Sequence, residues 1–260
     1  MTARDVYEGV LMELNKVHAP ALTVEEFVYF LNKAILAFSN ERYNFYAVNQ
    51  QLTDDLRVLL KSFVFSVTSV DIYDEPEGGM YVQGTIIDPD YFHLLSCDLI
   101  VRNTISNKTK KFTVKRTTLD MYGAIHNNEY LKPAIHRPYF LMLPTSGISQ
   151  QNNASFKILI GDDVANIVPS AVRIYYLKLP AHATLTDDQV YNLVGDGSSI
   201  LEFPDYLKNE FVKRVAWYQL EETRDQRAAS FPQLNQEIPN VPLELTGGGG
   251  SSVPQIQTQQ

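Results

Sequence analysis

Cysteine is nearly absent from this chain of 260 residues, and the single Cys97 excludes an intramolecular disulfide framework and any zinc site built on paired cysteines. Long hydrophobic runs are also missing: no stretch approaches about 18 uncharged apolar residues, so we expect no contact with a membrane. The first nine residues carry Arg4, Asp5 and Glu8 and lack the apolar core of a secretory signal. These absences predict a soluble protein of a reducing compartment, most simply the cytoplasm.

Positive charge is scarce as well. The chain has 22 Lys and Arg residues against 30 Asp and Glu, a formal net charge of −8, whereas a general nucleic-acid binder needs a basic face. The sequence also lacks the glycine-rich loops of nucleotide-binding proteins, the nucleophile elbow of hydrolases and the paired histidines of zinc proteases. We therefore predict no cofactor and no bound metal, and we predict that the protein is not an enzyme.

Residues 1–62 are predicted to form an N-terminal helical segment. Thr23 followed by Glu26 is a capping box, in which each side chain binds the backbone amide of the other residue. Apolar residues follow it at helical period, namely Phe27, Phe30, Leu31, Ala34, Ile35 and Phe38. A similar stripe before it consists of Val6, Val10, Leu14 and Val17. These patterns predict two amphipathic helices with a short break at Pro20.

The apolar period changes to two in residues 63–180. Phe63, Phe65 and Val67 alternate with Val64 and Ser66, as expected for a strand with one buried face. Further strands are predicted at residues 80–87, 99–101, 111–114, 139–143, 156–160 and 172–177. Strands outnumber helices here and prolines separate them, which favours an antiparallel sandwich or small barrel over a parallel sheet.

Helical periodicity returns in residues 181–235, which we expect to pack on the N-terminal helices. Leu207, Phe211, Val215 and Tyr218 share one face of a helix that opens near Pro204. Residues 236–260 contain a run of glycines and a glutamine-rich end, and they are predicted to be a flexible tail. The predicted fold class is therefore α+β, with a helical layer from both terminal segments and an inserted antiparallel β domain.

Charge is distributed unevenly along the β domain. Residues 63–100 hold no Lys or Arg and seven Asp or Glu, whereas residues 101–120 hold six basic residues and one acidic residue. Neighbouring strands could neutralise each other within one chain, or the basic block could face DNA or an acidic partner. A third hypothesis makes the two blocks a subunit interface between copies, formed by Asp71, Asp74, Glu75, Glu77, Arg102, Lys108, Lys110, Lys111, Lys115 and Arg116.

Catalytic candidates are few. Cys97 with His93 four residues before it could supply a nucleophile and a base, although a lone cysteine is more often a small buried apolar residue. His126, Glu129 and His136 are of metal-binding types, but their spacing matches no metal motif. A small soluble enzyme that uses Cys97 and His93 therefore remains the alternative hypothesis of a different class.

Several stretches at the two ends of the chain carry a resemblance to a known family. The N-terminal ones are MTARDVYE (1–8), LMELNKV (11–17), FLNKA (30–34), RYN (42–44) and NQQLTDDLR (49–57). The later ones are YYLKLP (175–180) and LEFPDYL (201–207) with the helix that follows. In these stretches, roughly residues 1–60 and 172–227, the chain resembles virion structural proteins of crAss-like, short-tailed bacteriophages.

This resemblance implies a head-to-tail connector, or portal adaptor, of the virion neck. Such a subunit forms a ring of about twelve copies beneath the portal protein, contacts adjacent tail or ring proteins, and lets genomic DNA pass without sequence-specific binding. Before assembly it is in the host cytoplasm. Another neck or tail ring, or a stopper protein, is the alternative within the same class. The tail is then expected to dock on the portal or tail through Ile238, Val241, Leu243, Leu245, Val253 and Ile256.

Overall fold

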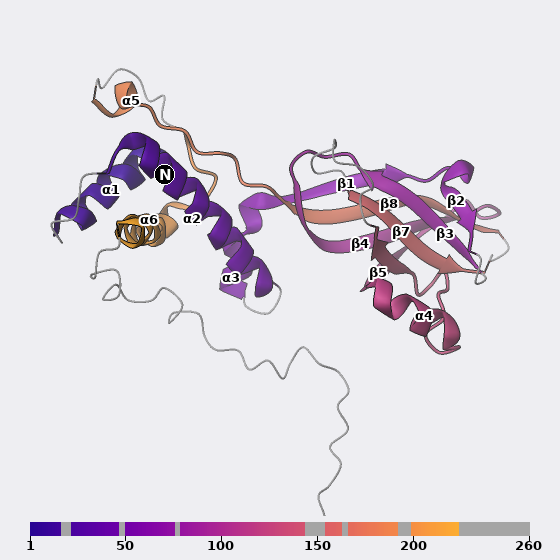
Figure 1. Cartoon of the computed structure of the whole chain (residues 1–260). Coiled ribbons are helices and arrows are strands. Elements are labelled where there is room, and N and C mark those ends of the chain that lie inside the picture. The colour runs from indigo at the N-terminus through magenta and orange to yellow at the C-terminus, as the bar shows by residue number, and fades with distance from the viewer. Residues whose placement is uncertain are drawn as a thin grey trace, which may run out of the picture.

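A computed structural model describes residues 1–16, 22–46, 50–75, 79–143, 154–162, 166–191 and 199–223, with the side chains of residues 16, 50–52 and 191 excepted. It confirms the predicted α+β class. Most helices gather at one end of the molecule, and a curled sheet with one short helix beside it forms the other end (Figure 1). None of the helices in these ranges combines the length and the apolar character that crossing a membrane requires.

The helical body combines both terminal segments of the chain. It contains α1 (Ala3–Lys16), α2 (Val24–Asn44), α3 (Gln50–Asp55) and α6 (Lys208–Glu222), and both α1 and α2 pack against α6. The apolar stripes predicted from the sequence meet in one core, whose largest fully buried side chains are Phe27, Leu31, Phe38, Leu56, Leu59 and Phe211. Burying each of these side chains stabilises the fold by about 1.5–3 kcal/mol.

The predicted capping box begins α2. The backbone N–H of Glu26 donates to Thr23 Oγ1 at 3.3 Å, and the backbone N–H of Thr23 donates to Glu26 Oε2 at 3.0 Å. Two amides that the first helical turn leaves without partners are thereby satisfied. This reciprocal pair explains why the helix starts at Val24.

Arg214 of α6 joins α6 to α2. Its guanidinium donates to both carboxylate oxygens of Glu41 at 3.1 and 2.7 Å, near the C-terminal end of α2. In the first half of α2, Phe30 stacks on Tyr218 of α6 with ring centroids 6.3 Å apart. An ion pair and an aromatic contact thus hold the two helices together at two places.

The sheet body is one eight-stranded sheet with the order β1-β8-β4-β5-β6-β7-β3-β2. Its strands are β1 (Leu60–Ser66), β2 (Ile72–Asp74), β3 (Met80–Ile86), β4 (Tyr91–Asn103), β5 (Thr109–Thr117), β6 (Tyr139–Met142), β7 (Ala154–Gly161) and β8 (Ile167–Lys178). β5 and β6 are parallel, and the other strand pairs are antiparallel. The purely antiparallel expectation is corrected at this pair, because α4 (Leu119–Asn127) forms a crossover that reverses the chain between the two strands.

The core of the sheet body lies inside the curl. The ring of Phe65 on β1 meets that of Phe156 on β7 edge to face at 5.7 Å, across the opening between the two edges of the sheet. Phe156 also stacks on Phe140 at 5.6 Å. The curl therefore buries the apolar face that a flat sheet would expose, and the described residues form no second sheet packed against it.

The two halves of the outer face of the sheet differ in whether a helix covers them. Ile125 of α4 packs with Tyr139 of β6 and Leu159 of β7, so α4 covers that half. On β1, β8 and β4 the outward side chains of Val64, Arg173 and Arg102 are exposed. The chain thus presents a strand surface without a helix over it among the described residues.

Short elements complete the described chain. They are the 3₁₀ turns η1 (Arg57–Leu59), η2 (Ser69–Asp71) and η3 (Asp205–Leu207), and the short helix α5 (Asp187–Tyr191). The α6 helix begins at Lys208, directly after η3, and Pro204 precedes that turn instead of opening the helix itself. The sequence thus locates this helix correctly but places its start a few residues early.

Candidate functional site

The basic residues predicted from the sequence lie on and around a β-hairpin. β4 and β5 pair over Cys97–Arg102 and Thr109–Val114. Asn103 shapes the turn between the strands, because its Oδ1 accepts the backbone N–H of Ile105 at 3.0 Å and that of Ser106 at 2.8 Å. Asn107, with φ of 55°, completes the turn in a conformation that asparagine tolerates.

Alternation along β5 separates its basic residues. Phe112 and Val114 belong to the sheet core, so Lys111 and Lys115 point to the outer side. Lys110 has the opposite orientation, and its Nζ lies 4.9 Å from the ring centroid of Phe112. The block that is continuous in the sequence therefore does not form one continuous patch.

Arg173 of β8 joins the outer side, although charge counting along the sequence did not find it. It pairs in register with Asp98 of β4, and its neighbours Val172 and Ile174 are buried. This alternation of apolar, basic and apolar residues is the signal that could have identified Arg173. We define the basic face by the outward, exposed cations Arg102, Lys111, Lys115 and Arg173.

Asp98 lies beneath the basic face and is 5% exposed. Lys111 Nζ approaches Asp98 Oδ2 at 2.9 Å, and Thr113 Oγ1 donates to Asp98 Oδ1 at 3.3 Å. The hydrogen bond to this carboxylate raises the pKa of Lys111. The acidic and basic blocks meet at this pair, which neutralises Asp98 and leaves the face with an excess of positive charge.

The other acidic residues do not gather on one surface. Asp71 caps its own turn, where Oδ2 accepts the hydroxyl of Thr68 at 2.6 Å and its backbone N–H at 2.8 Å. These two hydrogen bonds lower the pKa of Asp71. Glu75 is buried, pairs with Lys157 and accepts the hydroxyl of Tyr122. These acidic groups are held within the chain.

Three further residues of the acidic block are Asp74, Glu77 and Asp88. Asp74 is exposed at the end of β2, while Glu77 lies outside the described residues. Asp88 Oδ2 lies 2.9 Å from Lys61 Nζ and accepts the hydroxyl of Tyr176. Within the described part of the chain, the acidic block is thus dispersed, whereas much of the basic block stays accessible.

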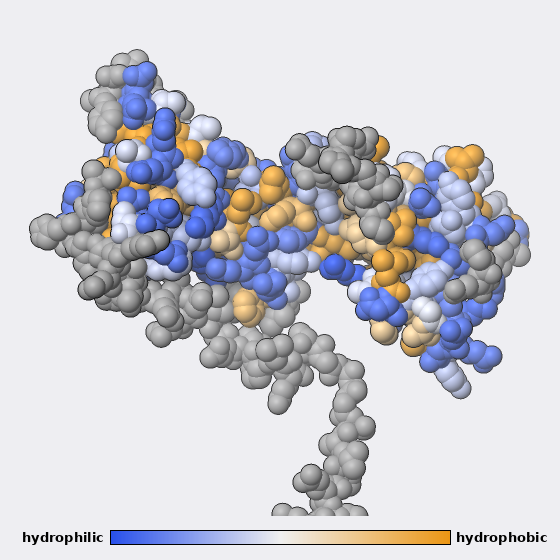
Figure 2. Space-filling view, viewed as in Figure 1, coloured by the Kyte–Doolittle hydropathy of each residue, from blue (hydrophilic) through white to orange (hydrophobic). Residues whose placement is uncertain are grey.

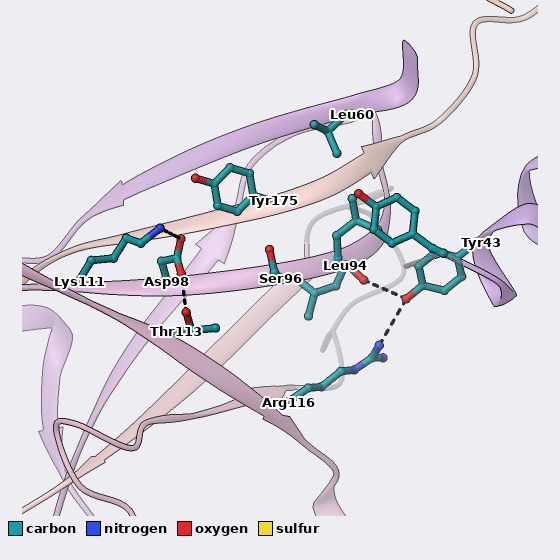
Figure 3. Close-up of a pocket in the computed structure, with 11 residues that line it drawn as sticks. Tyr43, Leu60, Leu94, Ser96, Asp98, Lys111, Thr113, Arg116 and Tyr175 are labelled. Carbon is teal, nitrogen blue, oxygen red and sulfur yellow. Dashed lines mark hydrogen bonds and ion pairs between the residues drawn. The ribbon is translucent and has the colours of Figure 1, made fainter. Parts of the chain in front are cut away.

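A groove of about 670 Å³ lies between the basic face and the helical body. The hydroxyl of Tyr43, near the end of α2, donates a hydrogen bond to the carbonyl oxygen of Leu94 at 2.8 Å. It also accepts a hydrogen bond from Arg116 Nη1 at 3.4 Å (Figure 3). Tyr175 and Ser96 lie on the floor beside Asp98. Hydrophobic surface is visible where the two bodies meet (Figure 2). The groove thus combines aromatic, apolar and cationic groups, a composition typical of protein contacts.

The structure does not favour Cys97 as a nucleophile. Cys97 is 2% exposed inside the sheet, and burial raises the pKa of its thiol. A thiol of raised pKa is protonated at neutral pH and reacts poorly. His93 is engaged elsewhere, because its ring stacks on Tyr43 at 4.1 Å and its Nε2 lies 2.8 Å from Asn40 Oδ1.

The two histidines in and near α4, His126 and His136, do not form a metal site with other described residues. The ring of His126 packs 4.6 Å from that of Tyr122, and His136 is exposed. In the ranges that the structure describes, three or more His, Cys, Asp or Glu side chains nowhere come together as a metal site would require. The exposed basic face and the adjoining groove are consequently the best candidates for a functional surface.

Comparison with known proteins identifies no family for this chain. No protein-family model matches the chain, and no curated protein matches it. The predicted docking residues of the tail, Ile238 to Ile256, lie outside the described residues. Of the predicted interface, the structure brings Arg102, Lys111 and Lys115 to one face.

Proposed function

We propose that this protein is a non-enzymatic structural subunit of a bacteriophage virion, which forms a ring as the head-to-tail connector beneath the portal. In this role the ring docks on the portal, continues the DNA channel and presents an attachment site for the tail. The subunit acts through surfaces and carries out no chemical step.

One observation carries the proposal. The stretches that resemble connector proteins of crAss-like phages lie at residues 1–60 and 172–227, separated by more than a hundred residues of sheet. In the fold most of them form a single body: Leu14 of α1, Phe30 of α2 and Leu220 of α6 belong to the same core cluster, while residues 175–178 lie at the end of β8, where Leu177 joins that cluster. The resemblance therefore covers a coherent unit of structure, as expected if it reflects a shared framework.

The surfaces of the molecule support the same role. A connector must bind its neighbours in the ring and also the components above and below it, so it needs several separate contact surfaces. The uncovered basic face, the adjoining groove and the exposed side of the helical body are three such surfaces. The overall negative charge also suits a DNA channel, because a strongly basic channel would retain the genome.

Mixing the purified chain with portal rings of its own phage tests the proposal. Negative-stain electron microscopy is expected to show portal rings with an additional layer on the tail-facing side, and mass photometry should give a mass increase of several subunits. A variant with Arg214→Ala, which disrupts the joint between α2 and α6, should decorate poorly because the helical body loosens.

The control is a neighbouring exposed residue, Lys213→Ala, which should bind as the wild type does. Portal rings that stay bare with the wild-type chain at low and high salt and across the neutral pH range would contradict the proposal. Binding that is equally strong with denatured chain would also contradict it, because docking requires the folded surfaces.

A further inference from the structure

We propose that the groove between the two bodies binds the C-terminal strap of a second copy of this chain, and that this contact joins neighbouring subunits of the ring. The C-terminal strap is defined as residues 237–245, with the sequence EIPNVPLEL, and it follows the last described residue, Thr223. The inference rests on the proposed function and specifies its subunit contact. It differs from the expectation drawn from the sequence, which placed the apolar residues of the strap on the portal or tail.

The groove offers a ligand both apolar surface and positive charge. Tyr43, Tyr46 and Leu95 line it as half-buried side chains, and Leu60 in the same lining is 46% exposed. Arg116 supplies the charge: its side chain is exposed, and its guanidinium donates to the hydroxyl of Tyr43 (Figure 3). Aromatic and apolar side chains beside an arginine are typical of the sites where proteins bind one another.

Asp98 is the acidic residue of the lining, and it does not oppose an acidic ligand. It is 5% exposed, and Lys111 and Thr113 already hold its two carboxylate oxygens. Arg116 therefore dominates the charge that an acidic ligand meets. Duplex DNA fits the groove poorly by comparison, because affinity for DNA rises with each phosphate that is neutralised and the lining has only two cations.

The C-terminal strap has the complementary composition. Both of its charged residues, Glu237 and Glu244, are acidic, and residues 228–260 contain no Lys or Arg. Proline restricts the backbone of the strap at two positions, which reduces the conformational entropy lost when a groove binds it. The prolines separate its apolar residues, which are Ile238, Val241, Leu243 and Leu245. The strap can therefore place apolar side chains on the tyrosines and leucines of the groove and a carboxylate near Arg116.

The position of α6 favours the groove of a second copy. Tyr218 of α6 stacks on Phe30, which precedes Tyr43 by thirteen residues, or about 20 Å along α2. The four residues that follow Tyr218 in α6 cover only about 6 Å, so the helix ends at a distance from its own groove. Residues 224–236 connect α6 to the strap and span up to about 45 Å when extended, which is long enough to cross to a neighbour.

A contact between strap and groove determines the type of assembly. The two surfaces differ, so the contact is heterologous, and each copy binds one neighbour with its strap and another with its groove. A closed ring then occupies every strap and every groove. A strap in the groove of its own chain would satisfy the same side chains and join no neighbours, which is why the experiments below distinguish the two arrangements.

Cysteine crosslinking of the full chain tests the contact directly, because the native Cys97 is buried. One preparation carries Ser96→Cys, at an exposed position in the groove, and the other carries Asn240→Cys within the strap. The two are mixed under mild oxidation. We expect a disulfide-linked heterodimer that forms at least about tenfold faster than in the control, because binding raises the effective concentration of one thiol near the other. In the control, Tyr130→Cys, 86% exposed beyond α4, replaces Ser96→Cys.

A labelled peptide of residues 235–246 supplies the second test. Its fluorescence anisotropy is measured as the full chain is added, and a peptide of the same composition in scrambled order is the control. Arg116→Glu, at an exposed position, should weaken binding about tenfold or more, and a peptide with Glu237→Lys and Glu244→Lys should recover it. Lys213→Glu makes the same change of charge at an exposed position of α6 and should bind the peptide as the wild type does.

Three results would overturn the inference. The first is equal crosslinking at Ser96→Cys and Tyr130→Cys, or peptide binding that ignores Arg116→Glu. The second is a chain carrying Ser96→Cys and Asn240→Cys together that crosslinks only within itself, which would assign the strap to its own groove. The third is binding of duplex DNA that Arg116→Glu abolishes in a chain that does not bind the peptide, which would assign the groove to DNA.

The outcomes also separate this inference from the proposed function. If the wild type decorates portal rings while Asn240→Cys crosslinks only to the portal, the inference fails and the proposed function stands. If the strap crosslinks to the groove of a second copy but the wild type never decorates portal rings, the proposed function fails and the contact between copies stands.

Discussion

Gly161 at the end of β7 occupies a position of the sheet body that only glycine fits. Its φ is +75°, and a Cβ built there would lie 2.2 Å from the carbonyl oxygen of Pro133. Both the backbone conformation and the space therefore require glycine. Gly123 in α4 is the opposite case, because a Cβ there meets no atom within 4 Å.

These two glycines give a prediction with an internal control. Gly161→Ala should lower the free energy of unfolding by about 3 kcal/mol, since backbone strain and steric overlap each cost about 1–3 kcal/mol. Gly123→Ala should raise it by about 0.5–1 kcal/mol through its helix propensity and a less flexible unfolded chain. Urea unfolding followed by tryptophan fluorescence and circular dichroism measures both. A Gly161→Ala variant as stable as the wild type would contradict the geometry described for this turn.

Individual residues of the candidate site were predictable only in part. Lys111 and Lys115 were found by counting charge, and the alternating pattern of β5 predicts that they share a side. The local sequence could not show that Asp98 pairs with Lys111, because that contact depends on the register of β4 against β5. Glu75 was assigned to a subunit interface for the same reason: its partner Lys157 lies more than eighty residues away.

At the scale of elements, α2 and β4 are coupled through His93. The imidazole stacks on Tyr43, approaches Asn40 and lies near the guanidinium of Arg116. Burial lowers the pKa of His93 below its ordinary value of 6.5, and the charge of Arg116 lowers it further. Protonation of His93 therefore opposes the contact between the helical body and the sheet.

This coupling predicts a pH dependence of stability. As the pH falls through 6.5, the unfolded chain protonates His93 before the native state does, so native stability is lost until the lower pKa of the folded state is passed. His93→Gln removes this loss, and its urea midpoint should change less than that of the wild type between about pH 7.5 and 5.5. His182→Gln, at an exposed histidine, is the control and should follow the wild type. Parallel curves for all three proteins would contradict the assignment to His93.

The elements themselves were largely predictable, and their pairing was not. Helical period and the capping box at Thr23 locate α2, because those signals are local. Strand alternation likewise locates β1 and β8. The parallel pairing of β5 with β6 escaped prediction, since side-chain alternation is the same in parallel and antiparallel strands and α4 was not recognised as a crossover.

At the scale of the whole molecule, the fold brings together what the sequence separates. The resemblance at both ends of the chain becomes one helical core, and the charge that seemed concentrated in residues 63–120 is redistributed. The acidic block is dispersed and in part neutralised within the chain, while the basic face remains accessible. The net charge of −8 therefore does not describe an evenly acidic surface.

An electron cryomicroscopy map of the neck of the intact virion that encodes this chain tests the central claim most directly. The account predicts a ring of copies of this chain directly beneath the portal. A map in which this chain traces to no ring of the neck or tail, or a virion that lacks the chain altogether, would contradict the account.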